Sequence, residues 1–278
     1  VVIAVKKIIA GLLNNSGAAT LGFEGNGPEV SIFKNVFEKP GIYKKTGSAW
    51  GLVGPDSKNS ANLSPVWSAI EGFFHGANQS EKNLADLVCL LEGRPYGLKS
   101  GITPLLIWAV LTHHRDSVCL YYDGTFIRNW DVEIFDLSGK APEKFTIRWV
   151  VAEQSTKTIV RSLSSVLLKD IPRGQKVGVN TILFGLYGWY KDLTEYSRQT
   201  NDISDQASEL RKAITSSADP IDLLFSDIPV SLGLQPFLHS ETNRLRSRVS
   251  SAQMQQLTGL FEDAITDIET SYCRLMSS

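Results

Sequence analysis

The four histidines have side chains that could bind a metal ion or transfer protons. His113 and His114 are adjacent in a segment with a helical pattern, where neighbouring side chains point about 100° apart. We therefore expect these two rings to diverge. Metal binding on one helix face needs ligands at i and i+4 instead. With Arg115 they place positive charge at a helix C-terminus, which the helix dipole favours.

The remaining histidines and the cysteines give no catalytic pattern. His75 and His239 are isolated in the sequence, and no nucleophile elbow or Cys-His signature accompanies them. Cys89, Cys119 and Cys273 lie in apolar patterns without C-x-x-C spacing, which predicts buried, reduced thiols. We therefore predict no catalytic residue, no metal site and no cofactor within the chain.

The segment Gly93–Ser100 partly matches a phosphate-binding loop of the form G-x-x-x-x-G-K-S/T. The gap between Gly93 and Gly97 is too short, and Leu98 stands before Lys99. A helical pattern also precedes the segment, whereas such a loop follows a strand so that its N–H groups converge on phosphate. We predict an interhelical turn.

Two further segments resemble parts of ligand sites. Gly25–Gly27 precedes a helical pattern, but Glu24 and Glu29 flank it and would repel an anion. Pro55–Lys58 contains half of a metal-dependent nuclease pattern, and no second D/E-x-K sequence completes it. We interpret the first as a turn and the second as a loop.

The bulk composition indicates an ordinary globular chain. Its 278 residues are 42% hydrophobic and 21% charged, enough for two domains. The 28 Lys and Arg residues balance 29 Asp and Glu residues, so phosphate neutralisation gains no excess positive charge. The longest apolar run, Ile102–Leu111, is far shorter than the roughly 20 residues that span a bilayer. We expect a cytoplasmic protein without a membrane partner and, because both ends lie within helical patterns, part of a longer polypeptide.

Helical signals dominate residues 1–82, which we predict to be an N-terminal helical region with a loop. Residues 1–14 show an apolar helical period, and Pro28 at a first helical position opens a helix through residue 38. Residues 41–63 predict a loop with short extended pieces, and Ser64 begins the next helix.

Residues 83–151 have the element order of a winged-helix module: helix, turn, helix, strand and hairpin. Leu84–Leu91 predicts the first helix, and Ser100 is expected to cap a second helix over residues 101–115. In a DNA-binding module this second helix would read base edges. Its sequence is apolar on nearly all faces, which favours a buried helix over one that offers Arg, Asn or Gln to DNA.

A hairpin follows the two helices. Val118–Tyr122 is strongly strand-prone, Asp123-Gly124 is a favoured hairpin turn, and residues 125–127 are the expected return strand. Asp131 then begins a short helix, and residues 145–151 predict a further strand.

We expect partner contacts at this hairpin and the segment after it. The residues expected to make these contacts are Lys99, in the turn before the second helix, and Tyr122, Asp123, Gly124, Arg128, Lys140 and Lys144. Their cations could also touch phosphates from a wing, so a module with non-specific duplex DNA contacts stays open as the alternative.

From about residue 155 the apolar period becomes 3.6, and residues 152–278 predict a helical bundle. Ser204 and Asp219-Pro220 are expected to start two of its helices. The last helix, from about Ser251 to Met276, carries an apolar stripe suited to a bundle core or a partner helix. The fold class predicted for the whole chain is α+β, mostly α.

Two segments resemble very large bacterial ATP-binding proteins, especially the ATPases of BREX and phage-growth-limitation defence systems. The first joins Arg94–Leu98, Ile102–Leu106 and Leu120–Phe126, and the second runs from Thr200 to Gly233. The resemblance implies a non-catalytic, winged-helix-containing part of a multidomain antiviral ATPase. Because no residue here matches the Walker motifs of that family, it also implies a nucleotide site elsewhere in the parent protein.

Three functional hypotheses follow. The first is an interaction or scaffold module that docks other domains of its parent protein or a protein partner. The second is the nucleic-acid-binding module described above. The third is an enzyme whose site is dispersed along the chain, which a deep pocket with convergent polar groups would indicate.

Overall fold

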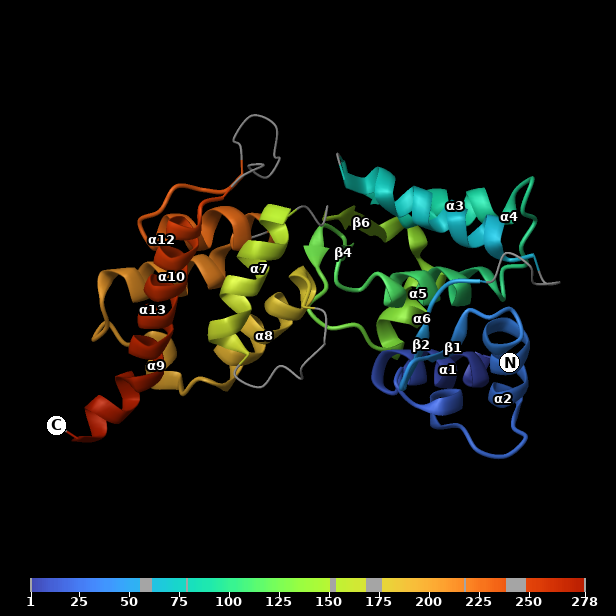
Figure 1. Cartoon of the computed structure of the whole chain (residues 1–278), viewed down its shortest axis with the longest axis horizontal. Coiled ribbons are helices and arrows are strands. Elements are labelled where there is room, and N and C mark those ends of the chain that lie inside the picture. Colours follow the sequence, from blue (N-terminus) through green and yellow to red (C-terminus); the bar gives the residue numbers. More distant parts are fainter. Residues whose placement is uncertain are drawn as a thin grey trace. The chain divides into compact units, whose positions relative to one another are not determined.

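The chain forms two compact units, Val1–Trp149 and Val150–Ser278, in a computed structural model (Figure 1). The structure describes residues 2–55, 62–78, 80–150, 154–168, 177–217, 219–238 and 249–277. The fold is mostly helical α+β with small antiparallel sheets, as the sequence predicts. Among the described residues, no helix combines the length and the apolar character that crossing a membrane requires.

Six α-helices lie in the described residues of the first unit, with short 3-10 and π-helical turns between some of them. The α-helices are α1 (Val2–Asn14), α2 (Pro28–Phe33), α3 (Ser64–His75), α4 (Leu84–Glu92), α5 (Thr103–His113) and α6 (Val132–Lys140). The shorter turns are η1 (Ala19–Gly22), η2 (Lys34–Glu38), η3 (Gly76–Asn78) and η4 (Pro142–Lys144). Because η2 continues α2, the helix predicted over residues 28–38 is confirmed.

Two antiparallel sheets accompany these helices. Strands β1 (Tyr43–Thr46) and β2 (Ala49–Leu52) pair within the segment predicted to be a loop with extended pieces. A second sheet has the strand order β3-β6-β4-β5. Its strands are β3 (Lys82–Asn83), β4 (Val118–Tyr122), β5 (Thr125–Phe126) and β6 (Phe145–Trp149).

The hairpin predicted at Asp123-Gly124 is confirmed. Tyr121 faces Phe126 and Tyr122 faces Thr125 across it. Asp123 and Gly124 both have positive φ, 46° and 74°, as a two-residue type I′ turn requires. The return strand β5 is short, and most of β4 pairs instead with β6.

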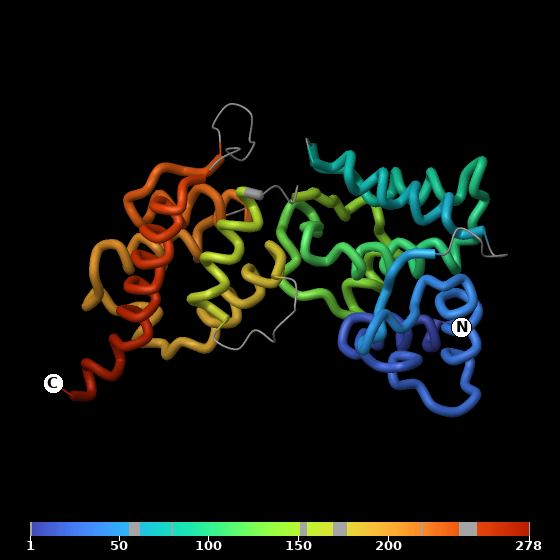
Figure 2. Tube along the Cα trace, in the orientation of Figure 1, coloured from blue at the N-terminus to red at the C-terminus, as the bar shows by residue number. Residues whose placement is uncertain are grey.

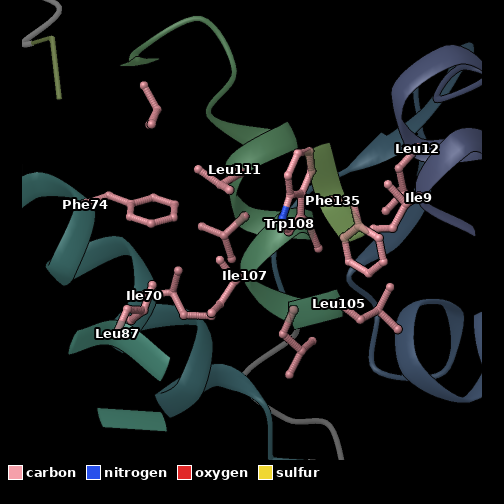
Figure 3. Close-up of a cluster of buried hydrophobic side chains, with 14 of the residues drawn as sticks. Ile9, Leu12, Ile70, Phe74, Leu87, Leu105, Ile107, Trp108, Leu111 and Phe135 are labelled. Carbon is pink, nitrogen blue, oxygen red and sulfur yellow. The ribbon is translucent and has the colours of Figure 1, made fainter. Parts of the chain in front are cut away.

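Helix α5 forms the centre of the first unit's core. Each residue from Leu105 to Leu111 is at most 2% exposed. In Figure 1 this helix lies between α3 and α4 on one side and α1 and α6 on the other. Figure 3 shows the side chains that surround it: Ile9 and Leu12 of α1, Ile70 and Phe74 of α3, Leu87 of α4, and Phe135 of α6. The predicted burial of this helix is confirmed.

The same core joins the N-terminal region to the segment after residue 83. Buried residues of α1, α3, α4, α5 and β6 belong to one hydrophobic cluster. A buried hydrogen bond reinforces the contact of α5 with α6, since the Trp108 indole N–H donates to Ser138 Oγ over 2.8 Å. Residues 1–82 and 83–149 are therefore parts of one packed unit.

The predicted N-cap of α6 is confirmed, but that of α5 is not. Asp131 Oδ1 accepts a hydrogen bond from the Ile134 N–H at 2.9 Å, and α6 extends beyond the predicted short helix to Lys140. The prediction that Ser100 caps α5 is wrong, because the N-cap position is Ile102 and no side chain caps the helix. Pro104 in the first turn supplies no N–H, which reduces the need for a cap.

The second unit is built from helices. They are α7 (Gln154–Leu167), α8 (Val179–Asp192), α9 (Glu195–Gln199), α10 (Asp205–Ser216), α11 (Pro220–Asp222), η5 (Leu223–Asp227), α12 (Ile228–Ser231) and α13 (Ser251–Ser277). The caps predicted at Ser204 and Asp219 are confirmed by side-chain hydrogen bonds to the following N–H groups.

Helix α13, red in Figure 2, packs against α7, α9 and α10. Its apolar stripe is buried from Met254 to Ile268. Beyond that point Tyr272 and Leu275 are exposed. The stripe therefore serves the unit's own core over most of its length.

The cysteine prediction is correct in part. The three cysteines all lie in the described part of the chain and none of them forms a disulfide; Cys119 on β4 is buried. Cys89 on α4 and Cys273 on α13 are exposed, so the prediction that they are buried is wrong. Each lies on a helix whose core-facing residues are its neighbours, such as Leu87 and Leu91 beside Cys89.

Candidate functional site

Four of the residues expected to contact a partner lie together at the tip of the β4-β5 hairpin. Tyr122, Asp123 and Gly124 end β4 and form the turn, and Lys144 lies directly before β6. The Asp123 N–H donates to the Lys144 carbonyl oxygen at 2.9 Å, which fixes the turn against that residue. We call Tyr122, Asp123, Gly124 and Lys144 the hairpin tip.

The cation of the hairpin tip is compensated within it. Lys144 Nζ lies 3.5 Å from Asp123 Oδ2 and 5.7 Å from the centre of the Tyr122 ring. The Asp123 carboxylate, followed by Tyr122, raises the pKa of Lys144 above its ordinary value. The tip thus presents an exposed ion pair beside an aromatic ring, with little net charge.

The other three expected contact residues lie elsewhere along the chain. Lys140, at the end of α6, donates to Asp136 Oδ2 at 2.6 Å, and Asp136 also pairs with Lys6 of α1 at 3.0 Å. The hydrogen bonds from Lys140 and then Lys6 lower the pKa of the Asp136 carboxyl. Arg128 is exposed after β5, and Lys99 is exposed in the turn between α4 and α5.

A second cluster gathers three histidines and a glutamate in the first unit. Glu71 and His75 come from α3, whereas His113 ends α5 and His114 follows it. Glu71 Oε1 lies 2.9 Å from His114 Nε2 and also accepts the indole N–H of Trp67 at 2.9 Å. One ligand atom from each of Glu71, His113 and His114 lies within 4.8 Å of the others.

Aromatic rings lie against parts of this cluster. The His75 and His114 rings contact Trp149 of β6 edge to face, with ring centres 4.5 Å and 5.3 Å away. Trp67 contacts the His113 ring in the same way, at 5.6 Å. We call Glu71, His113 and His114 the His-Glu cluster.

The prediction that the His113 and His114 rings diverge is wrong. It treated both residues as helical, but α5 ends at His113, and His114 has φ −104° and ψ 22°. The change of backbone direction brings the ring centres within 4.7 Å. His75 is also not isolated, because its ring centre lies 6.2 Å from that of His114.

Sequence reasoning missed Glu71, although a signal for it exists. Glu71 and His75 have the i, i+4 spacing that places two side chains on one helix face. That signal says nothing of His113 and His114, which lie at and just after the end of α5. The meeting of α3 with the end of α5 is a tertiary contact that no local pattern contains.

The other motif segments follow their structural interpretations. Gly93–Ser100 is a turn between α4 and α5, as predicted, and the element directly before it is the helix α4. Gly25–Gly27 is a turn that leads into α2. Asp56–Lys58 and His239 lie outside the described residues.

Comparison of the chain with protein-family models, curated proteins and solved structures finds no match.

Proposed function

We propose that this chain is a non-catalytic docking module that binds another protein segment, within a larger ATP-binding protein of the anti-phage defence type. The parent class comes from the resemblance of two segments described above. The docking role rests on the structure of the first unit. The contact surface is the hairpin tip, with Arg128 as a flanking contact.

The observation that carries the proposal is the internal compensation of the hairpin tip. A wing that binds DNA without sequence preference needs lysines and arginines that are available to phosphates. At this tip, Lys144 is paired with Asp123, and on α6 Lys140 is paired with Asp136. A tyrosine beside a paired lysine and aspartate is instead typical of protein interfaces. Such interfaces are enriched in Tyr and have a polar rim.

Burial of α5 also argues against base readout. The order α4, α5, β4, β6 and the neighbouring strands β3-β6-β4 support a winged-helix-like organisation, with α5 in the place of a recognition helix. Yet Leu105–Leu111 is covered by neighbouring helices. A helix buried in this way cannot enter a major groove, so the wing is the part left for contacts.

Site-specific photocrosslinking in the parent protein tests this proposal. A photoreactive phenylalanine analogue replaces Tyr122, and a matched protein carries it at Tyr272, an exposed tyrosine of the second unit. After irradiation in the cells that make the protein, cross-linked peptides are identified by mass spectrometry. We expect one recurrent protein segment joined to position 122 and absent from position 272.

Two results would contradict the proposal. Recovery of nucleic acid, rather than peptide, on position 122 would favour the DNA-binding alternative, and equal cross-linking from both tyrosines would remove the hairpin tip as a specific surface. ATP hydrolysis by the isolated chain above background would contradict the non-catalytic part.

A further inference from the structure

We propose that the His-Glu cluster binds a divalent transition-metal ion of the zinc class, with Glu71, His113 and His114 as its protein ligands. This inference is independent of the docking role. It starts from one feature of the first unit: two imidazoles and a carboxylate meet at the junction of α3 and the end of α5.

The distances suit a common metal ion after small side-chain rotations. With metal–ligand bonds of about 2.1 Å, neighbouring ligand atoms lie about 3.0 Å apart in octahedral and about 3.4 Å apart in tetrahedral coordination. Glu71 Oε1 and His114 Nε2 are 2.9 Å apart, which already fits. With an outer limit of 4.8 Å for the set, the farthest pair must approach by at most about 1.4 Å for tetrahedral or about 1.8 Å for octahedral coordination.

The backbone under the ligands is held in place by the core. Ile70 and Phe74, on either side of Glu71 in α3, are fully buried. Val110 and Leu111, which precede His113, are equally buried. Glu71 and His113 therefore project from two helices held by the core, and His114 projects from the residue directly after the second one.

The surroundings of the carboxylate are those of a supported metal ligand. The Trp67 indole donates to Glu71 Oε1 at 2.9 Å, and such outer hydrogen bonds orient ligands and raise metal affinity. Neighbouring Trp67 and Trp149 rings limit access of water from their sides. His113 is exposed, so an ion can enter and leave.

The ligand types indicate the class of metal. Two imidazoles and one carboxylate favour Zn²⁺, Co²⁺ or Ni²⁺ over Ca²⁺ and Mg²⁺, which prefer oxygen alone. Three protein ligands leave at least one coordination position for water or for a group of another molecule. The proposed site thus differs from a closed structural zinc site, which has four protein ligands.

Metal titration of the purified, dialysed chain tests the proposal. Affinity for Zn²⁺ is measured by competition with a chromogenic chelator, and Co²⁺ absorption reports nitrogen and oxygen coordination. We expect one ion per chain. Glu71→Gln, His113→Asn and His114→Asn should each weaken Zn²⁺ binding by at least about 10-fold.

His75→Asn is the matched control, because it removes an imidazole that touches His114 but is not a proposed ligand. Its Zn²⁺ affinity should stay within about 3-fold of wild type. Far-UV circular dichroism checks the fold of every variant. His113→Asn changes an exposed side chain, so it keeps the test valid even where Glu71→Gln fails to fold.

Several outcomes would overturn the site. One is a dissociation constant for Zn²⁺ weaker than about 100 µM. Another is an unchanged Zn²⁺ affinity in His113→Asn. Loss of binding in His75→Asn equal to that in the ligand variants would overturn the assigned ligand set. Binding that disappears only when the exposed thiols Cys89 and Cys273 are blocked would place the ion elsewhere.

Discussion

Truncation of Ile107 should destabilise the first unit much more than truncation of Ile102 on the same helical segment. Ile107 in α5 is 1% exposed, whereas Ile102, the N-cap residue, is 40% exposed. Ile107→Ala removes three carbon groups worth about 0.8 kcal/mol each and leaves a cavity that adds to the loss. We expect a total of about 3 to 4 kcal/mol, against less than about 1 kcal/mol for Ile102→Ala.

Urea unfolding followed by tryptophan fluorescence measures this difference. Five of the chain's six tryptophans, at positions 50, 67, 108, 130 and 149, belong to the first unit. For a slope near 2 kcal/mol per molar urea, the unfolding midpoint of Ile107→Ala should fall by roughly 1.5 to 2 M. Equal midpoint shifts in the two variants, or a loss below about 1 kcal/mol for Ile107→Ala, would refute the account of α5 as the core helix.

Three further predictions concern individual groups. Asp131→Ala should lower the unfolding free energy of the first unit by about 1 kcal/mol by removing the bond to the Ile134 N–H; Asp131→Asn should restore most of it, and equal losses would contradict the cap. Ser204→Ala should cost the second unit about 1 kcal/mol, measured by circular dichroism during urea unfolding, since Ser204 Oγ accepts the Ala207 N–H; no change would exclude this capping role. Burial raises the pKa of Tyr43 from 10.0 to about 12, so folding favours its neutral form. The unfolding free energy should therefore be constant below pH 10 and fall between pH 10 and about 12. Tyr43→Phe should lack this part of the fall, and identical pH profiles in wild type and variant would contradict the assignment.

Features with a complete local signal were predictable from the sequence. Asp131, Ser204 and Asp219 have the side chains and the following helical patterns that define N-caps, and each is a cap in the structure. Asp123-Gly124 predicts a type I′ turn because both residues tolerate positive φ. The uniformly apolar sequence of α5 predicted its burial for an equally direct reason.

Features that depend on tertiary contacts were not predictable in this way. The main partner of β4 is β6, which an intervening helix separates from it in sequence. Glu71 contacts His114, which lies 43 positions later in the sequence. The error at His113 and His114 came from the end of α5, since one residue outside the helix changes the direction of its side chain. Tyr122, Asp123, Gly124 and Lys144 lie together in the structure, but their role as a contact surface stays a prediction.

The most direct test of the docking proposal is the affinity of the chain for the protein segment that cross-links to position 122. We expect Tyr122→Ala to weaken that binding by at least about 30-fold, because an aromatic anchor at an interface contributes about 2 kcal/mol or more. Tyr272→Ala, which changes an exposed tyrosine of the second unit, should leave the affinity unchanged. Equal affinity of wild type and Tyr122→Ala, or displacement of the segment by duplex DNA, would contradict the account.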